Sequence, residues 1–508
     1  MVVRSRRRAA LVTLAGGYAN VLVSTAGALL LIPFYLTYIG SRLYGAWLGS
    51  GGILAWLAVL DLGLASLMIQ RIAEAHGRNE RARIGDYLST GLALQLLMVA
   101  LMVAGAALLA PRFPSWMGIS GSEASQLSAA FMLAAAANGI NVLNNGAVGF
   151  LRALQITVLP NVLAMVASVT GMVTTLVMLF QGWGVRAIPA GLVVGGVLQL
   201  ILNVPYGALI YRREVSAPLR PTRATVRDFM AVSGPLLASK LGTAAMNRSD
   251  AALITILLRP ELATSYALTR RAADVVQRLL DRFGAAAFAG FSHLVSCDEH
   301  QRAGQVHRQI MDIYSGAGAV MIGAYLAGNA AFVDLWVGEA YFLGPAVTIL
   351  VGLAVFAGGA SSLANYLLGA TGRITAGAWI GLGEAMARVP LMLILLLSVG
   401  VVGLPVAVLL TAVIAGVMSV RMTFAALGHP DVDPVGPWRS LAVKAGVVAA
   451  GALIGALWQP TSWIGLGALL TMYTVAGGLL LVTSLPELRR IALPRWRARF
   501  GNAAEGAA

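Results

Sequence analysis

The stretch VLPNVLAMVASVTGMVTTLVMLF occupies residues 158–180 and contains no charged side chain. As an α-helix of 23 residues it extends for about 35 Å, enough to cross a hydrocarbon core of about 30 Å. Five residues later a second apolar stretch, RAIPAGLVVGGVLQLILNVPYGALIY, covers residues 186–211. Apolar runs of this length, separated by short polar turns, recur along the chain. The pattern predicts a membrane protein built from helices.

The composition supports the same fold class. Hydrophobic residues make up 58% of the 508 residues and charged residues only 11%, and the mean hydropathy is +0.80. A soluble chain of this length needs far more charge to cover its surface. The longest polar stretches run to about 15–25 residues, so no large soluble domain is expected.

The net charge of +15 does not indicate nucleic-acid binding, because the basic residues lie in short loops rather than on one continuous face. The positive-inside rule accounts for them and predicts that both termini are cytoplasmic. The single cysteine, Cys297, excludes an internal disulfide. No nucleotide-binding loop, metal-ligand cluster or nucleophile motif is present, so we expect no cofactor and no enzymatic activity.

Fourteen stretches are expected to cross the membrane, near residues 13–38, 44–70, 87–110, 125–149, 158–180, 186–211, 229–258, 262–294, 309–331, 342–368, 374–398, 403–424, 439–458 and 462–484. With the N-terminus in the cytoplasm, every strongly basic segment falls on the inner side. Each outward connection then carries at most one basic residue. This alternation supports the number of spans.

The predicted organisation is two six-helix bundles followed by two further helices. The expected parts are an N-terminal bundle (1–211), a cytoplasmic basic loop (212–228), a C-terminal bundle (229–424), spans thirteen and fourteen (425–484) and a cytoplasmic basic tail (485–508). Parallel repeats of this kind are a common transporter plan.

Ionisable residues inside the predicted spans point to function. The eighth span carries six of them: Arg270, Arg271, Asp274, Arg278, Asp281 and Arg282. Four recur at every fourth position and so share one helix face. Each costs roughly 2.5–3.5 kcal/mol at the centre of a bilayer, so a polar partner or a wet cavity is expected. An excess of arginine suits a phosphate-bearing substrate, because guanidinium binds phosphate oxygens bidentately.

A structural explanation stands beside this one. The region is longer than one span needs, so Arg270 and Arg271 also fit the outer interface, and Asp281 and Arg282 the inner one. Arg–Asp pairs of this kind also lock helix packing. In the seventh span, Arg248 and Asp250 are expected near mid-membrane, at ~1.5 Å per residue from its outer end.

Other polar residues inside spans allow two interpretations each. Asp61 in the second span is a candidate cation or proton site, or a residue satisfied by a neighbouring helix. Asn138, Asn141, Asn144 and Asn145 in the fourth span either line a cavity or bind helices together. Glu384 and Arg388 lie four residues apart in the eleventh span and are expected to pair with each other. The Gly451-xxx-Gly455 repeat is expected to serve helix packing alone.

Two short motifs carry a family resemblance. YGAW at residues 44–47 and LDLGL at 60–64, followed by a basic loop, resemble the start of bacterial polysaccharide (O-antigen type) flippases. These belong to the multidrug/oligosaccharidyl-lipid/polysaccharide (MOP) exporter superfamily. Asp250, followed by a short outward turn and Tyr266, is similar to the start of that family's second half. The span count also fits, so the resemblance covers essentially the whole chain.

The resemblance implies a MATE-like fold of two bundles around a central cationic cavity, working by alternating access in the bacterial inner membrane. The implied cargo is a polyprenyl-diphosphate-linked oligosaccharide, turned from the cytoplasmic to the periplasmic leaflet for surface polysaccharide such as O-antigen, lipopolysaccharide or exopolysaccharide. Implied partners are membrane lipids, H⁺ or Na⁺, a polysaccharide polymerase and glycosyltransferases, and no nucleic acid.

Residue roles follow from the same resemblance. Four arginines are expected to bind the diphosphate or acidic sugars, with Arg271 beside them: Arg248, Arg270, Arg278 and Arg282. Asp250 and Asp274 would keep these arginines oriented. Asp61 and Asp250 are the candidates for coupling to a cation gradient.

Three rival functions remain open. A multidrug antiporter typically has twelve spans and an acidic cavity, whereas this chain is predicted to have fourteen and a basic one. A lipid II flippase shares the span count, and the charge of the cavity does not distinguish it from an oligosaccharide flippase. A membrane polysaccharide polymerase or ligase needs a catalytic surface outside the membrane, and the outward loops are too short for one.

Overall fold

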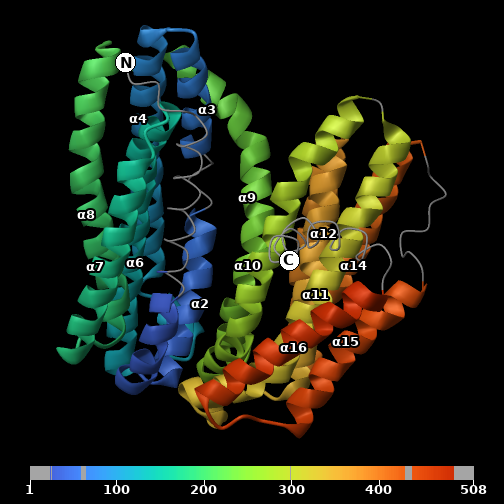
Figure 1. The fold of residues 1–508 in the computed structure, drawn as a ribbon. Coiled ribbons are helices and arrows are strands. Elements are labelled where there is room, and N and C mark those ends of the chain that lie inside the picture. The colour runs from blue at the N-terminus through green and yellow to red at the C-terminus, as the bar shows by residue number, and fades with distance from the viewer. Residues whose placement is uncertain (1–22, 24–25, 59–63, 298, 429–437, 485–508) are drawn as a thin grey trace, which may run out of the picture. The chain divides into compact units, whose positions relative to one another are not determined.

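The computed structural model describes residues 23, 26–58, 64–297, 299–428 and 438–484, without the side chains of 55–58, 232–248, 282–287, 289 and 438–439. These residues form helices joined by short turns, and no β-strand occurs among them (Figure 1). The expected all-α fold is confirmed.

The predicted spans three to fourteen each coincide with one long helix. These are α4 (Arg81–Leu109), α6 (Gly121–Ala153), α7 (Val158–Phe180), α8 (Ala187–Ile210), α9 (Arg223–Leu257), α10 (Pro260–Ser296), α11 (His300–Val337), α12 (Pro345–Ala370), α13 (Ile374–Val399), α14 (Gly403–Ala426), α15 (Trp438–Leu457) and α16 (Trp463–Ser484). The first span contains the apolar helix Ala26–Tyr38. The second overlaps α2 (Ser41–Ala58) and the start of α3 (Leu64–Gly77).

Short helical turns lie in the connections: α5 (Phe113–Trp116), η2 (Gly184–Arg186), η3 (Tyr211–Val215), η4 (Glu339–Tyr341) and η5 (Gly400–Val402). Within the described residues, nine helical segments are long and apolar enough to cross a bilayer, and one of them, Ile374–Ala426, contains both α13 and α14. The chain is therefore a multi-pass membrane protein.

The chain divides into two compact units, Met1–Thr264 and Ser265–Ala508. Unit 1 contains α2 to α9 and the first turn of α10, and unit 2 contains the rest of α10 and α11 to α16. The predicted parts 1–211, 212–228, 229–424, 425–484 and 485–508 describe a repeat plan, which this division does not test. That plan stays a prediction.

Helix α9 packs on α2 within unit 1. The approach is close because α2 has glycine at the contact: a Cβ on Gly49 would lie 2.7 Å from Thr255 Oγ1. The Thr255 hydroxyl also donates a hydrogen bond to the carbonyl of Gly45, at 3.3 Å. Small residues four apart allow such contacts between membrane helices. Helix α9, the predicted seventh span, is thereby bonded to α2.

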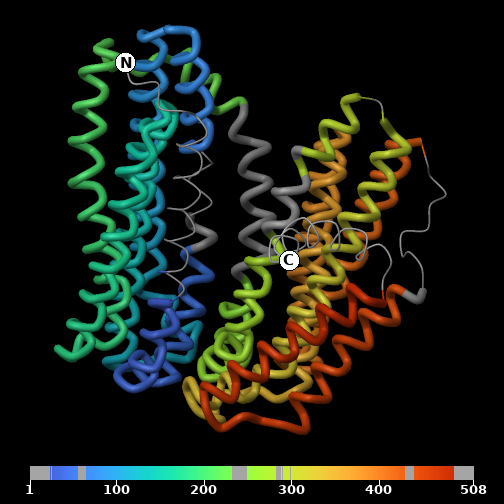
Figure 2. Tube along the Cα trace, in the orientation of Figure 1, coloured from blue at the N-terminus to red at the C-terminus, as the bar shows by residue number. Residues whose placement is uncertain are grey.

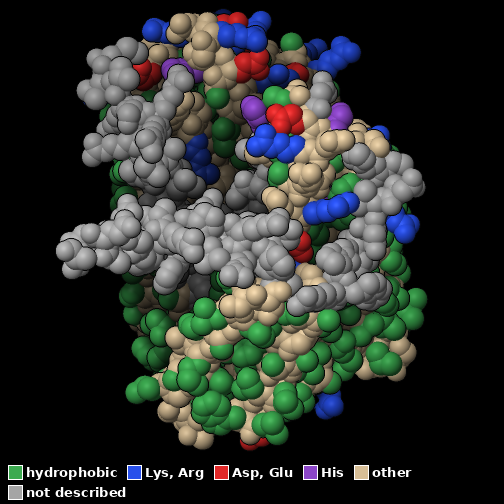
Figure 3. Space-filling model, turned by 45° about the vertical axis from the view of Figure 1, so that its right-hand side comes forward, with side chains coloured by type: hydrophobic (Ala, Val, Ile, Leu, Met, Phe, Trp, Pro, Cys, Tyr) green, Lys and Arg blue, Asp and Glu red, His purple; other side chains and the backbone are tan. Residues whose placement is uncertain are grey.

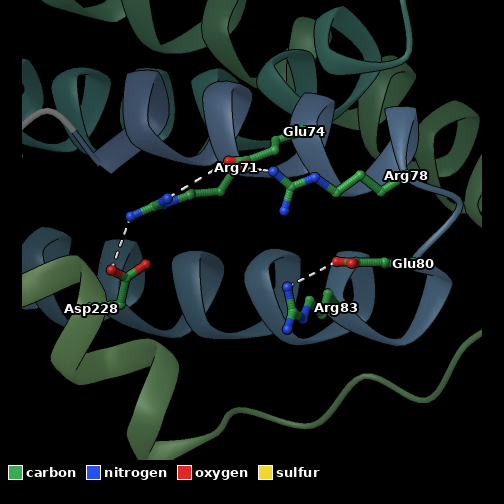
Figure 4. A network of polar contacts seen from close by, with 6 residues as sticks. All are labelled: Arg71, Glu74, Arg78, Glu80, Arg83 and Asp228. Atoms are coloured by element: carbon green, nitrogen blue, oxygen red, sulfur yellow. Dashed lines mark hydrogen bonds and ion pairs between the residues drawn. The ribbon is translucent and has the colours of Figure 1, made fainter.

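One end of unit 1 is held by an apolar cluster with charged residues beside it. Met68, Ile72 and Phe229 are fully buried there. Next to them the Arg71 guanidinium donates to Asp228 Oδ1 at 2.9 Å, which joins α3 to α9 (Figure 4). Ion pairs Arg78–Glu74 and Arg83–Glu80 lie in the same network (Figure 4).

In unit 2, helix α11 packs against α12, α15 and α16. The α15–α16 pair runs beside α11 (Figure 2). A Cβ on Gly451 would lie 2.2 Å from the Gly323 carbonyl oxygen, and one on Gly455 would lie 2.3 Å from that of Leu326. The Gly451-xxx-Gly455 repeat therefore serves helix packing, as expected.

Candidate functional site

Helix α10 has one apolar face and one charged face. Tyr266, Ala273 and Leu280 follow each other at seven-residue spacing and are each 3% exposed or less. This spacing places them on one face, which packs in unit 2. Arg271 and Arg278 follow Tyr266 and Ala273 by five residues, which turns them about 140° around the helix. The two arginines thus lie far from the face formed by Tyr266, Ala273 and Leu280. Near the start of the helix, however, Thr264 and Leu268 are also buried, on the side of Arg271.

Arg270 and Asp274 form an ion pair on the flank of α10. Arg270 Nε donates to Asp274 Oδ1 at 2.9 Å, and the two side chains are 24% and 29% exposed. The pairing reduces the cost of partly burying an arginine. Both groups keep enough exposure to meet a ligand. The oxygens of a phosphate would compete with this partly buried carboxylate for the Arg270 guanidinium.

Thr269 fixes the turn of α10 that precedes this pair. The Asn329 amide of α11 donates to the Thr269 carbonyl at 3.1 Å, and the Tyr325 hydroxyl donates to the same oxygen at 3.3 Å. The Thr269 hydroxyl accepts from the Leu343 backbone N–H at 3.1 Å. Tyr325 lies within electrostatic reach of Arg270 and Asp274. This buried hydrogen-bond network holds α10 against α11 and the connection to α12.

The sequence did not single out this network. Thr269 stands beside a run of charged residues that dominates the pattern. Asn329 is one polar residue among many apolar ones in its helix. An amide in the interior of an apolar helix is the signal that could have found it, since buried amides need partners.

The remaining predicted site residues have different outcomes. Arg278 is exposed, and Arg271 is half-buried. Asp250, in α9 of unit 1, is buried with 9% exposure. Asp61 lies outside the described residues, as do the side chains of Arg248 and Arg282. Among the predicted site residues, the structure bonds Arg270 to Asp274.

A second arginine pair lies wholly inside unit 2. Arg388 and Glu384 of α13 form an ion pair with side chains only 5% and 6% exposed. Arg388 Nε also donates to Thr411 Oγ1 of α14 at 3.1 Å, and Ser361 of α12 hydrogen-bonds Glu384. The predicted pairing is confirmed. It joins three helices and is closed to solvent.

A third pair crosses from α15 to α11. Lys444 Nζ donates to Asp312 Oδ1 at 2.8 Å and to Ser315 Oγ at 2.7 Å. Lys444 is nearly buried, with a side chain 9% exposed, against 30% for Asp312. This pair was not predicted.

The asparagines of α6 divide between two roles. Asn144 is buried, donates to Gln199 of α8 and accepts from Asn203 at 3.0 Å. Asn138 donates to the Ala134 carbonyl of its own helix at 3.0 Å. Asn141 and Asn145 are exposed. The helix-binding interpretation therefore holds for Asn144.

Among the described residues no group of three or more His, Cys, Asp and Glu side chains is placed to hold a metal ion. The polar groups that do come together are arginines, carboxylates, hydroxyls and amides. Such a set recognises anions and hydroxyl-rich ligands by charge and hydrogen bonding.

The fold is that of membrane transporters and flippases. A multidrug resistance MATE family transporter of the MOP superfamily, in its inward-facing conformation, is 15% identical with a TM-score of 0.65, over 83% of this chain and 100% of that chain. The lipid II flippase MurJ, inward closed, is 11% identical with a TM-score of 0.67, over 93% and 98%. The Vibrio cholerae MATE transporter VcmN in the bent form is 15% identical with a TM-score of 0.52, over 84% and 99%. At these identities the likeness establishes the fold.

The sequence itself gives the family. A family model described as "Polysaccharide biosynthesis protein" matches residues 14–294, more than half of the chain. The chain belongs to this polysaccharide biosynthesis family, and the MOP resemblance read from its motifs is confirmed. No curated protein matches the sequence.

Proposed function

We propose that this protein is a flippase, which moves a polyprenyl-diphosphate-linked oligosaccharide from the cytoplasmic to the periplasmic leaflet of the bacterial inner membrane. The observation that carries the proposal is the charged face of α10, in a chain of the polysaccharide biosynthesis family. Arg270 and Asp274 pair there while remaining about a quarter exposed, and Arg278 is exposed. A diphosphate needs cationic donors of this kind.

The mechanism we infer is alternating access. Arg271 and Arg278 bind phosphate oxygens, and Arg270 exchanges part of its bond to Asp274 for a bond to substrate. The network around Thr269 keeps α10 in place during this exchange. From the family resemblance we also expect Arg248 and Arg282 to bind the substrate and Asp250 to keep arginines oriented. Asp61 and Asp250 are the candidates for coupling to H⁺ or Na⁺. Both termini lie in the cytoplasm.

A lipid II flippase is the second candidate, since MurJ matches 93% of this chain, a larger share than the 83% matched by the MATE transporter. Its cargo also bears a diphosphate on a polyprenyl chain, so the α10 arginines would serve it equally. The glycan separates the two functions. A polysaccharide polymerase or a glycosyltransferase would act before or after this step as a partner.

The test uses cells that lack the protein. We expect polyprenyl-diphosphate-linked oligosaccharide to accumulate on the cytoplasmic side, with rescue by the wild type. The Arg248→Ala/Arg278→Ala variant, matched for expression, should fail to rescue. The matched control is Arg112→Ala/Arg259→Ala, which removes two exposed arginines from connections between helices. Unchanged surface polysaccharide with no lipid-linked intermediate would refute the proposal, and peptidoglycan arrest would favour lipid II.

A further inference from the structure

The connection between α8 and α9, residues 211–222, is fixed to unit 1 along its length. It begins as the single π-helical turn η3, in which Tyr211 and Val215 are 8% and 2% exposed. Both side chains belong to the apolar cluster that contains Ile84 of α4. The connection is thereby anchored by its apolar side chains.

Polar contacts fix the rest of it. The Tyr211 hydroxyl donates to the Ala217 carbonyl at 2.8 Å. A Cβ on Gly85 of α4 would lie 2.6 Å from the Pro218 carbonyl oxygen, so the backbones of the connection and of α4 are in close contact. Thr222 caps α9 by accepting from the Thr225 N–H at 3.3 Å. The backbone that carries the solvent-exposed side chains of this segment is therefore held in place.

Those outward side chains are mainly arginines. Five exposed arginines lie on the connection and the first two turns of α9: Arg212, Arg213, Arg220, Arg223 and Arg227. Within the described part of the chain, none of their guanidinium groups has a hydrogen-bond or ion-pair partner. The acid Asp228 is engaged by Arg71, which leaves Glu214 as the other carboxylate of the stretch. Figure 3 shows Lys and Arg side chains gathered at the upper end of the view.

We call this surface the basic strap (residues 211–227). Its positive charges repel one another. Arg223 and Arg227 stand four apart on α9, where like charges repel. The first turn of that helix contains no acidic residue, although positive charge is disfavoured at a helix N-terminus. An anion outside the protein would relieve both costs.

Apolar residues beside the arginines indicate the kind of anion. Leu219 is 53% exposed, Met230 48% and Leu209 43%. The helical segment Gly184–Val215, which leads into the strap, is one of the apolar membrane-crossing candidates. The strap thus begins where a span leaves the bilayer. A soluble acidic protein matches the charge but not these apolar side chains, whereas a membrane surface matches both.

We propose that the basic strap binds anionic phospholipid headgroups. The arginines contact the lipid phosphates, and Leu219 inserts between neighbouring headgroups. Such binding goes beyond the flippase proposal, because the strap lies in unit 1 and contains none of the residues assigned to the glycan substrate. It would make the stability of unit 1 depend on the lipid composition of the membrane.

The experiment uses the purified full-length protein in a neutral detergent, titrated with phosphatidylglycerol or phosphatidylcholine. The readout is the lipid concentration that gives a half-maximal rise in Tm. The test variant is Arg212→Gln/Arg213→Gln/Arg220→Gln. The matched control, Arg112→Gln/Arg259→Gln/Arg373→Gln, removes the same charge from other exposed positions.

We expect phosphatidylglycerol, but not phosphatidylcholine, to raise the Tm of the wild type, and 0.5 M salt to weaken the effect. The half-maximal concentration should increase at least about tenfold in the test variant and less than about twofold in the control. Equal shifts in the two variants would show non-specific charge attraction and overturn the proposal. Unchanged lipid binding with loss of function in cells would overturn it in favour of an acidic protein partner.

Discussion

Helices α10 and α13 of unit 2 each carry an arginine and a carboxylate four residues apart. In α13 the pair Arg388–Glu384 is 5% and 6% exposed and is bonded to neighbouring helices. In α10 the pair Arg270–Asp274 is 24% and 29% exposed and has further arginines on the same helix. The same spacing therefore occurs in two different environments.

Burial decides what each pair can do. The charges of Arg388 and Glu384 are enclosed by α12, α13 and α14 and neutralise each other. They cannot contact a ligand unless these helices separate. Two charges at the flank of α10 can exchange partners at low cost. We infer a structural role for the α13 pair and propose a substrate role for the α10 pair. Two further pairs extend the comparison to a series: Lys444–Asp312, with side chains 9% and 30% exposed, lies between them in burial, and Arg71–Asp228, 30% and 38% exposed, is the most exposed of the four.

The largest effect on stability is expected for Arg388→Ala. The substitution leaves Glu384 buried without its partner, and breaking a buried pair in this way costs about 3–5 kcal/mol. The measurement is the midpoint of thermal unfolding of the purified protein in detergent, together with the folded yield. A midpoint within experimental error of the wild type would end the structural assignment of this pair.

The double variant Glu384→Leu/Arg388→Met is the control for that experiment. It removes both charges and keeps apolar volume, so most of the lost stability should return. If the double variant is as unstable as the single one, packing rather than an unpaired charge explains the loss.

A smaller loss is expected for Lys444→Ala. Lys444 is nearly buried, but Asp312 is 30% exposed and regains water when its partner is removed. The expected cost is about 1–2 kcal/mol, with loosening of α15 from α11. Hydrogen exchange of the α15 amides would detect this. Protection like that of the wild type would show that the glycine contacts alone hold the helix.

For Arg270→Ala we expect little change in stability, below about 1 kcal/mol, because both partners are partly exposed. Transport of lipid-linked oligosaccharide should fall at least about tenfold. Arg270→Lys keeps the charge but not the bidentate geometry and should retain only part of the activity. Full transport by the alanine variant would remove Arg270 from the substrate site.

The smallest effect is expected for Arg71→Ala. The pair with Asp228 is 30% and 38% exposed, so its contribution is about 0.5 kcal/mol and is screened by salt. Unfolding midpoints of the variant and the wild type should converge in 0.5 M salt. A loss of stability as large as that of Arg388→Ala would show that burial does not determine how much each ion pair contributes.

The helices were predictable because the bilayer fixes their length. Each apolar run, such as residues 158–180, had to be long enough to cross it. Local pairs such as Glu384–Arg388 follow from the helix repeat alone. Contacts between distant segments were not predictable in this way. Lys444 meets Asp312 from 132 residues away, and Thr411 meets Arg388 only because α14 packs on α13.

The charged stripe of α10 shows where periodicity stops being sufficient. Residues spaced four apart are each rotated by about 40° around the helix axis from the one before, because the α-helical repeat is 3.6 residues. The stripe therefore drifts from the flank at Arg270 towards the opposite face at Arg278. The orientation of the stripe became clear only from the burial of Tyr266, Ala273 and Leu280, which marks the side of α10 that packs in unit 2.

The most direct test measures transport per folded protein for two variants side by side: Arg278→Ala in α10 and Glu384→Leu/Arg388→Met in α13. We expect Arg278→Ala to lose at least about tenfold in oligosaccharide translocation with an unchanged unfolding midpoint, while the α13 double variant keeps most of its transport. Normal transport by Arg278→Ala together with loss in the double variant would show the opposite, that the substrate uses the buried pair rather than the charged face of α10.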